Sequence, residues 1–156
     1  MLKIKTVQAH CDIPCKIYDP AIAQYAALSI IRFIDLISEV GEGNLTTSQI
    51  AQLSRLTQQK EEHSKEVKRE ITTIWGDYFK EPQISKFPNI HELVHLIMQD
   101  ASKCKQDIDR VNAENLLKNI NTFTEIFWAT KDTETKSFIA PYPPEMEVIC
   151  PILKSA

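Results

Sequence analysis

The stretch that decides how the chain is built lies near its start and reads His10-Cys11-Asp12-Ile13-Pro14-Cys15-Lys16-Ile17-Tyr18-Asp19-Pro20. It gathers one imidazole, two thiols and a phenol within a short segment. Asp12 and Pro14 disfavour a helix or strand, whereas Asp19 followed by Pro20 is typical of a helix cap and a first-turn proline. The sequence therefore predicts a tight, irregular loop that ends where a helix begins.

The side chains of this loop indicate a metal site. Cys11 and Cys15 offer soft thiolates and His10 a borderline nitrogen, but three side chains are too few for a closed structural zinc site. The missing donors could be backbone nitrogens if the chain were cut between Ala9 and His10. The His10 amine, the Cys11 amide and both sulfurs would then form a planar set of two nitrogens and two sulfurs, which suits Ni(II) or Cu(II).

Residues 1–9 are accordingly predicted to be a leader that is removed on maturation. Its last residue, Ala9, is small, but the segment is too short and too charged to be a secretory signal peptide. Reduced thiols in a bacterial cytoplasm are the simpler expectation. Cys104 and Cys150, outside the loop, are interpreted as packing or surface thiols.

The loop closely resembles the nickel-binding hook of the nickel superoxide dismutases, whose precursors carry a leader that is removed immediately before the histidine. Two further stretches are similar to segments of this family, so that the resemblance covers roughly residues 10–131. They read Trp75-Gly76-Asp77-Tyr78-Phe79-Lys80 and Ile126-Phe127-Trp128-Ala129-Thr130-Lys131.

This resemblance implies that the protein converts superoxide to oxygen and hydrogen peroxide, with one nickel ion per subunit alternating between Ni(II) and Ni(III). It implies that His10, Cys11 and Cys15 hold the metal, and that the His10 imidazole adds an axial bond in the oxidised state. Tyr18 corresponds to a gatekeeping tyrosine that holds substrate or water without binding the metal. The family forms homohexamers with hooks sheltered among subunits, and a dedicated peptidase removes the leader.

The surroundings of the metal are expected to differ from the best-known family pattern. There, a glutamate and an arginine orient the axial imidazole, and the matching positions here are Ala26 and His63. We therefore expect His63 to orient the His10 ring directly or through water. Its alternative interpretation is an inward-leaning histidine on a solvated helix. Asp12 is expected to order the hook, and Pro14 to fix its turn, with Ile13-Pro14 a candidate cis peptide bond.

The rest of the chain predicts one all-α domain, an antiparallel four-helix bundle over residues 20–131 behind the hook at 10–20. Helices are expected over residues 20–40, from 46–48 to 79, 89–105 and 109–130, with Pro82 ending the second. The apolar seam of the second helix runs through Lys60 and then His63 or Ser64. The first helix is apolar nearly all round, which indicates contact with neighbouring subunits.

The tail, residues 132–156, is expected to be extended and to lie over its own bundle or a neighbour's, since four prolines exclude a helix there. No strand pattern is evident. No stretch is predicted to span a membrane, because Gln24, Arg32 and Asp35 interrupt the apolar run of the first helix. The net charge of −3 argues against a nucleic-acid partner.

Two alternative interpretations remain at this stage. His91-Glu92-Leu93-Val94-His95 fits the H-E-x-x-H pattern of zinc metalloproteases, with Glu114 imaginable as a third ligand. Such enzymes need a substrate-aligning sheet edge, so surface histidines on an amphipathic helix are the simpler explanation. The second alternative is a non-enzymatic nickel or copper delivery protein that uses Cys11 and Cys15 and needs no free amine.

Overall fold

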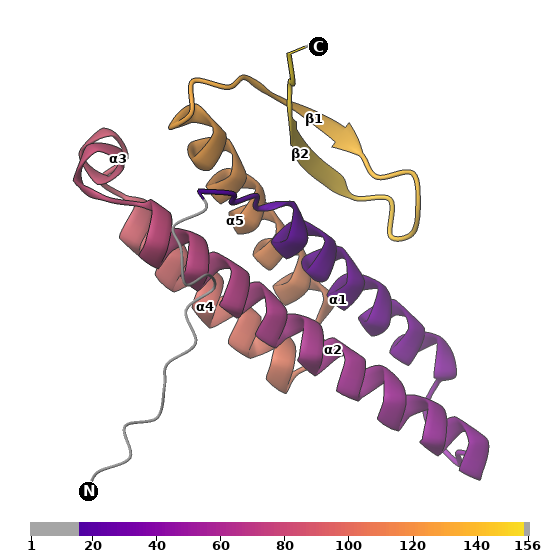
Figure 1. The fold of residues 1–156 in the computed structure, drawn as a ribbon. Coiled ribbons are helices and arrows are strands. Elements are labelled where there is room, and N and C mark those ends of the chain that lie inside the picture. Colours follow the sequence, from indigo (N-terminus) through magenta and orange to yellow (C-terminus); the bar gives the residue numbers. More distant parts are fainter. Residues whose placement is uncertain (1–15, 155–156) are drawn as a thin grey trace, which may run out of the picture.

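The protein is mostly helical, and its computed structural model describes residues 16–154. Four long helices pack along one another: α1 (Ala21–Val40) and α4 (Ile90–Gln106) each contact both α2 (Thr47–Thr73) and α5 (Arg110–Ala129). A small hairpin of β1 (Thr135–Ile139) and β2 (Glu147–Pro151) lies against one side of this helical body (Figure 1). Residues 16–20 lead directly into α1.

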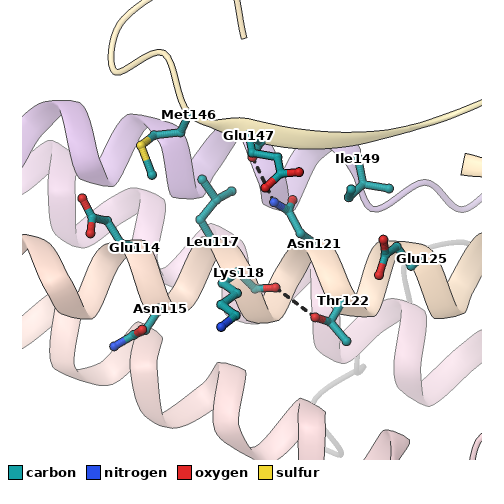
Figure 2. A pocket seen from close by; sticks show the side chains of 10 residues that line it. All are labelled: Glu114, Asn115, Leu117, Lys118, Asn121, Thr122, Glu125, Met146, Glu147 and Ile149. Atoms are coloured by element: carbon teal, nitrogen blue, oxygen red, sulfur yellow. Dashed lines mark hydrogen bonds between the residues drawn. The ribbon is translucent and has the colours of Figure 1, made fainter. Parts of the chain in front are cut away.

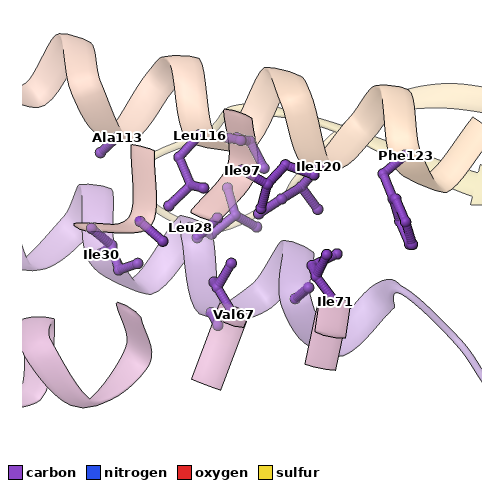
Figure 3. Packing of buried hydrophobic residues seen from close by; sticks show 14 of the residues in the cluster. Leu28, Ile30, Val67, Ile71, Ile97, Ala113, Leu116, Ile120 and Phe123 are labelled. Atoms are coloured by element: carbon purple, nitrogen blue, oxygen red, sulfur yellow. The ribbon is translucent and has the colours of Figure 1, made fainter. Parts of the chain in front are cut away.

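The core lies between the four long helices, where their apolar stripes meet (Figure 3). These stripes recur at helical spacing, so each helix buries one face against the others. The members of the core that are fully buried and largest in volume include Ile30, Ile31, Ile34, Val67, Ile71, Ile90, Ile97, Leu116, Ile120, Phe123 and Phe127. This single core holds α1 in a fixed position and therefore fixes the point at which residues 16–20 enter it.

Three of the predicted helices agree with the structure to within one or two residues, and side-chain capping bonds mark the start of two of them. A carboxylate oxygen of Asp19 accepts a hydrogen bond from the Ala21 amide at the start of α1, at 2.9 Å. A carboxylate oxygen of Asp109 does the same for the Val111 amide in α5, at 2.9 Å. Such bonds satisfy amides that have no partner inside the helix. Asn89 precedes α4 as predicted, but its side chain makes no capping bond.

The predicted end of the second helix is wrong in detail. The α-helix ends at Thr73 and continues as the π-helical turn η1 (Ile74–Tyr78), in which the Phe79 amide donates to the Ile74 carbonyl five residues back, at 3.4 Å. Pro82 does not end this element. It lies instead in the first turn of a short helix that the sequence analysis missed, α3 (Glu81–Lys86), where a proline is well tolerated.

The tail also differs from the prediction that no strands occur. β1 and β2 form an antiparallel pair in which Thr135 faces Pro151, Ser137 faces Ile149 and Ile139 faces Glu147. The prolines between the strands lie in the connecting loop, so helix is excluded as expected. The strand pattern was not apparent because β1 is exposed along most of its length and shows no alternation of apolar and polar residues.

The apolar character of α1 has two consequences. Among the described residues, α1 is long and apolar enough to cross a membrane on length and composition alone. By these criteria Gln24, Arg32 and Asp35 do not exclude a membrane span, contrary to the prediction. Half of its most apolar window is buried in the fold, as in the core helix of a folded domain. Ile22 and Tyr25 nevertheless remain 48% and 54% exposed, which leaves an uncovered apolar strip near the start of α1.

Candidate metal centre

The predicted metal ligands His10, Cys11 and Cys15, together with Asp12 and Pro14, lie outside the described residues. The structure begins at Lys16, whose φ of 60° falls in the left-handed region that side chains rarely adopt. The chain therefore turns sharply just after the last predicted ligand. Three residues later it enters α1 through the Asp19 cap.

Tyr18 is the one residue of the predicted catalytic set that the structure describes, and it is half-buried. Its ring lies 5.9 Å, centroid to centroid, from the ring of Tyr78, at an angle of 48°. Tyr78 belongs to the π-helical turn η1, and such single turns are frequent at functional sites. The turn brings a second phenol to the base of the hook, a feature that the sequence analysis did not predict.

Tyr78 is held in turn by the end of α5. Its hydroxyl and the hydroxyl of Thr130 are hydrogen-bonded at 2.6 Å, and the Thr130 hydroxyl donates to the Phe127 carbonyl, also at 2.6 Å. The Lys131 ammonium lies 4.6 Å from the centre of the Tyr78 ring, within the range of a cation–π contact. The end of α5 thus fixes Tyr78, the residue that packs against Tyr18, and places a positive charge on its ring.

A hollow of 240 Å³ opens beside Tyr18, between the segment that precedes α1 and the end of α2. Its lining includes Ile17, Ile22 and Ile74 and two carboxylates, from Asp19 and Glu70. Ile17 is 78% exposed. The surface beside Tyr18 is therefore mostly apolar, and no other segment within residues 16–154 covers Ile17.

His63 lies elsewhere. Its Nδ1 is 2.9 Å from the Gln59 carbonyl oxygen, and its ring packs edge-on against Phe33, 5.3 Å between centroids. Phe33 is twelve residues beyond Ala21, or about 18 Å along the helix axis at the usual rise. The structure does not bring His63 next to Tyr18. The seam of α2 runs through buried Lys60 and Ser64, with His63 only half-buried at its side.

The other residue of the altered pair, Ala26, is 2% exposed and packs in the core. Its methyl group can neither donate nor accept a hydrogen bond. The carboxylate of the usual family arrangement therefore has no counterpart at this position.

The H-E-x-x-H motif does not form a metal site. Trp75 donates its indole N–H to Nδ1 of His91 at 3.0 Å, and His95 pairs with Gln99 one turn later. Glu114, the imagined third ligand, is instead ion-paired with Arg110. Within residues 16–154 no group of three or more histidine, cysteine, aspartate or glutamate side chains could hold a metal ion. These histidines are surface residues, as expected.

The remaining thiols behave as packing groups. Cys104 is buried in the core, and burial raises the pKa of its thiol to about 12, so that it stays protonated. Cys150 is half-buried on β2, and neither thiol forms a disulfide. A larger hollow of 450 Å³ lies between α5 and β2 and is lined by Asn121, Met146 and Ile149 among others (Figure 2). Its lining includes Glu114 but none of the residues predicted to form the nickel site.

Comparison with known proteins decides the family. Residues 5–131 match the family model described as nickel-containing superoxide dismutase. The chain belongs to the nickel-containing superoxide dismutase family. The matched range includes the hook, the π-helical turn that carries Tyr78 and the end of α5. It stops before the β1–β2 hairpin.

Individual members of this family are similar over most of the chain. The superoxide dismutase [Ni] of Streptomyces coelicolor is 33% identical over 126 residues, which cover 81% of this chain and 91% of that protein. The enzyme of the same name from Streptomyces seoulensis is 33% identical over 129 residues, 83% and 92% of the two chains. The native crystal structure of a nickel superoxide dismutase superposes with a TM-score of 0.68 at 33% identity, covering 78% of this chain and 99% of the other.

Proposed function

We propose that this protein is a nickel-dependent superoxide dismutase that converts superoxide to oxygen and hydrogen peroxide. The observation that carries the proposal is the hook itself, His10-Cys11-Asp12-Ile13-Pro14-Cys15, on a chain that belongs to the nickel enzyme family. Its donor set fits nickel, because two anionic sulfurs with two nitrogens in a plane suit Ni(II). A metal-delivery protein is not favoured, since the named relatives are enzymes.

Bound nickel supplies one-electron chemistry by alternating between Ni(II) and Ni(III). Cys11 and Cys15 would hold it through their sulfurs, and the Cys11 amide and the amine of His10 would supply the nitrogen donors. The thiolates and the deprotonated amide would donate charge that stabilises the higher oxidation state. The imidazole of His10 would be a further donor. Pro14 would turn the chain so that Cys15 reaches the metal, and Asp12 would order the hook.

Tyr18 is the residue that connects this ligand set to the folded domain. Its packing against Tyr78, and the bond from Tyr78 to Thr130, restrict where the phenol can lie. A phenol fixed close to the metal can hold superoxide or water by a hydrogen bond without binding nickel. The Lys131 ammonium near this pair favours the approach of an anion.

The finer features belong to the same proposal. The four long helices form an antiparallel bundle, with the hook ahead of α1 and a tail beyond residue 131. Residues 1–9 are a leader that a peptidase removes, and the enzyme acts in the bacterial cytoplasm as a homohexamer. The exposed apolar surface of Ile17, Ile22 and Tyr25 beside the hook supports burial against neighbouring subunits.

We further propose that His63 orients the imidazole of a hook histidine. Its position beside Phe33, well along α1, makes a hook from a neighbouring subunit as suitable a partner as its own. Replacing His63 by alanine should shift the electronic spectrum of the oxidised nickel site and lower turnover. His63→Asn keeps hydrogen bonding and serves as the matched control. The idea is wrong if His63→Ala leaves both the spectrum and the turnover unchanged.

The test of the function compares two nickel-loaded forms, one that begins at His10 and one that retains residues 1–9. Activity confined to the form that begins at His10 would support both the chemistry and the need for the terminal amine. Equal activity in both forms would refute amine ligation. Inactivity in both, despite tight nickel binding, would favour metal delivery instead.

A further inference from the structure

The β1–β2 hairpin lies outside the part of the chain that the family accounts for. The family match ends at residue 131, and 78% of this chain suffices to cover 99% of a solved family member. Residues 135–151 are therefore an addition to the shared helical body. Their role cannot follow from the reaction that the family performs.

The outer edge of β2 is hydrogen-bonded to the helical body, as the bonding pattern inside the hairpin shows. The Ala140 amide donates to the Met146 carbonyl at 2.9 Å, and the Ile152 amide to the Glu134 carbonyl at 2.8 Å. Because bonded and non-bonded pairs alternate, the backbone of Glu147 points away from β1. Its carbonyl accepts a hydrogen bond from the Asn121 amide of α5 at 2.9 Å (Figure 2).

The opposite edge, on β1, is open. The same alternation directs the N–H and C=O groups of Thr135, Ser137 and Ile139 away from β2. Within residues 16–154, no hydrogen bond from another segment reaches these groups. Phe138 and Ile139 on this strand are 48% and 64% exposed. An edge of this kind is a template for a further strand, and natural proteins usually protect it.

We propose that this edge binds the same edge of a second copy, so that two hairpins form one four-stranded antiparallel sheet centred on Ser137. In this register Ser137 pairs with the partner's Ser137, and Thr135 pairs with the partner's Ile139. The outward groups of both strands are then satisfied, with roughly six hydrogen bonds at two per bonded pair. The strand that binds this edge is thus β1 of a second copy.

The charge on the strand favours this partner and this register. Centring on Ser137 places Lys136 opposite the partner's Phe138. The ammonium of Lys136 already lies 5.5 Å from its own Phe138 ring, so the strand's cation and aromatic ring are compatible neighbours. A shift of the centre to Lys136 would instead place two lysines directly opposite each other, which is unfavourable. It would also place the outward groups of Ile139 opposite Thr133, whose amide already donates to the Trp128 carbonyl.

The test uses the full chain and the pair Ser137→Pro and Ser137→Ala. Both remove the hydroxyl that donates to the Glu147 carboxylate. Only proline removes the outward N–H, and this N–H serves no bond inside the hairpin. A single strand pair is a small contact, so the association should depend on concentration. Sedimentation velocity over a concentration series should show the association step in Ser137→Ala and its weakening by about thirtyfold in Ser137→Pro, equivalent to about 2 kcal/mol.

Amide hydrogen exchange on the unmodified protein provides a second measurement that needs no variant. At high concentration the amides of Thr135, Ser137 and Ile139 should be as protected as those of Lys136 and Phe138, which bond to β2. Fast exchange of the three outward amides under these conditions would overturn the proposal. Identical association of Ser137→Pro and Ser137→Ala would also overturn it, even with protected amides, because something other than a second copy would then cover the edge.

Discussion

Lys60 should be among the residues that contribute most to stability, although it is charged. Its side chain is 1% exposed in the seam of α2. Its ammonium donates to the carbonyl oxygens of Cys104, Lys105 and Asp107, the last two at 3.0 and 2.8 Å. These carbonyls lie at the end of α4, where helical carbonyls have no partner of their own and the helix dipole favours a cation. Lys60, which lies on α2, therefore satisfies the free carbonyl groups at the end of α4.

Replacing Lys60 by methionine keeps most of the volume and removes all three bonds. The contact with Cys104 is buried, so its carbonyl would lose its partner at a cost of about 1–3 kcal/mol. The other two carbonyls are only partly buried and can recover water, which leaves roughly 0.5–1 kcal/mol each. We expect a loss of about 2–5 kcal/mol in the free energy of unfolding. Near 3 kcal/mol, this corresponds to a fall in Tm of about 6–12 °C.

The assay is denaturant and thermal unfolding at one fixed protein concentration, because association changes apparent stability. Lys65→Met is the matched control, since Lys65 is exposed on the same helix and paired with exposed Glu62. The control should change stability by no more than about 0.5 kcal/mol. If Lys60→Met were no more destabilising than Lys65→Met, the reasoning about the end of α4 would be refuted.

The pH dependence of stability, compared between the natural protein and Lys60→Met, tests the direction in which the pKa of Lys60 is shifted. Burial lowers the pKa of Lys60 from its ordinary value of 10.5. The folded protein therefore releases this proton at a lower pH than the unfolded chain. Between the two pKa values the unfolded state holds more protons, so the stability of the natural protein should rise with pH relative to Lys60→Met. If the stability of the natural protein relative to Lys60→Met fell as the pH approaches 10.5, this account would be contradicted.

Two further predictions concern local features. Thr46→Ala should lower the free energy of unfolding by about 1 kcal/mol, because Thr46 and Gln49 cap α2 reciprocally; Ser48→Ala is the control, and equal effects in both would count against the cap. Because burial holds the pKa of the Cys104 thiol at about 12, iodoacetamide at pH 8 should modify Cys150 but not Cys104 in the folded protein. Peptide mapping reads each thiol separately, and equally rapid modification of both would be inconsistent with the buried position of Cys104.

The helices could be predicted from the sequence where local chemistry marks their ends. Asp19 and Asp109 precede apolar periodic segments, and each carboxylate makes the expected capping bond. The π-helical turn at Ile74–Tyr78 could not be predicted in this way, since its wider bonding leaves the apolar spacing almost unchanged. The six residues of α3 are too few for periodicity to be evident.

Features that depend on distant segments were less predictable. The seam of α2 was correctly expected to pass through Lys60, but its carbonyl partners come from a helix that is more than forty residues away in the sequence. The hairpin was missed because burial of β2 arises from packing on the helices and not from a pattern within β1.

The candidate site, too, was predictable only in part. Its ligands could be predicted because the hook is contiguous, and these remain predictions because residues 10–15 lie outside the described part. The surroundings of Tyr18 could not be predicted, since Tyr78 packs against it from one other segment and Lys131 contacts Tyr78 from another. The Trp75–Lys80 and Ile126–Lys131 stretches contained this signal, because each resembles a family segment and they supply these two residues.

The central claim is that nickel held by the thiolates of the hook catalyses the dismutation of superoxide. Its most direct test is the decay of superoxide, followed by stopped-flow spectroscopy, with nickel-loaded protein that begins at His10 and with the same form carrying Cys15→Ser. We predict rapid catalytic decay with the first protein and none above the spontaneous rate with the second, at equal protein concentration. Equal catalysis by both proteins, or none by the first despite one bound nickel per subunit, would contradict the account.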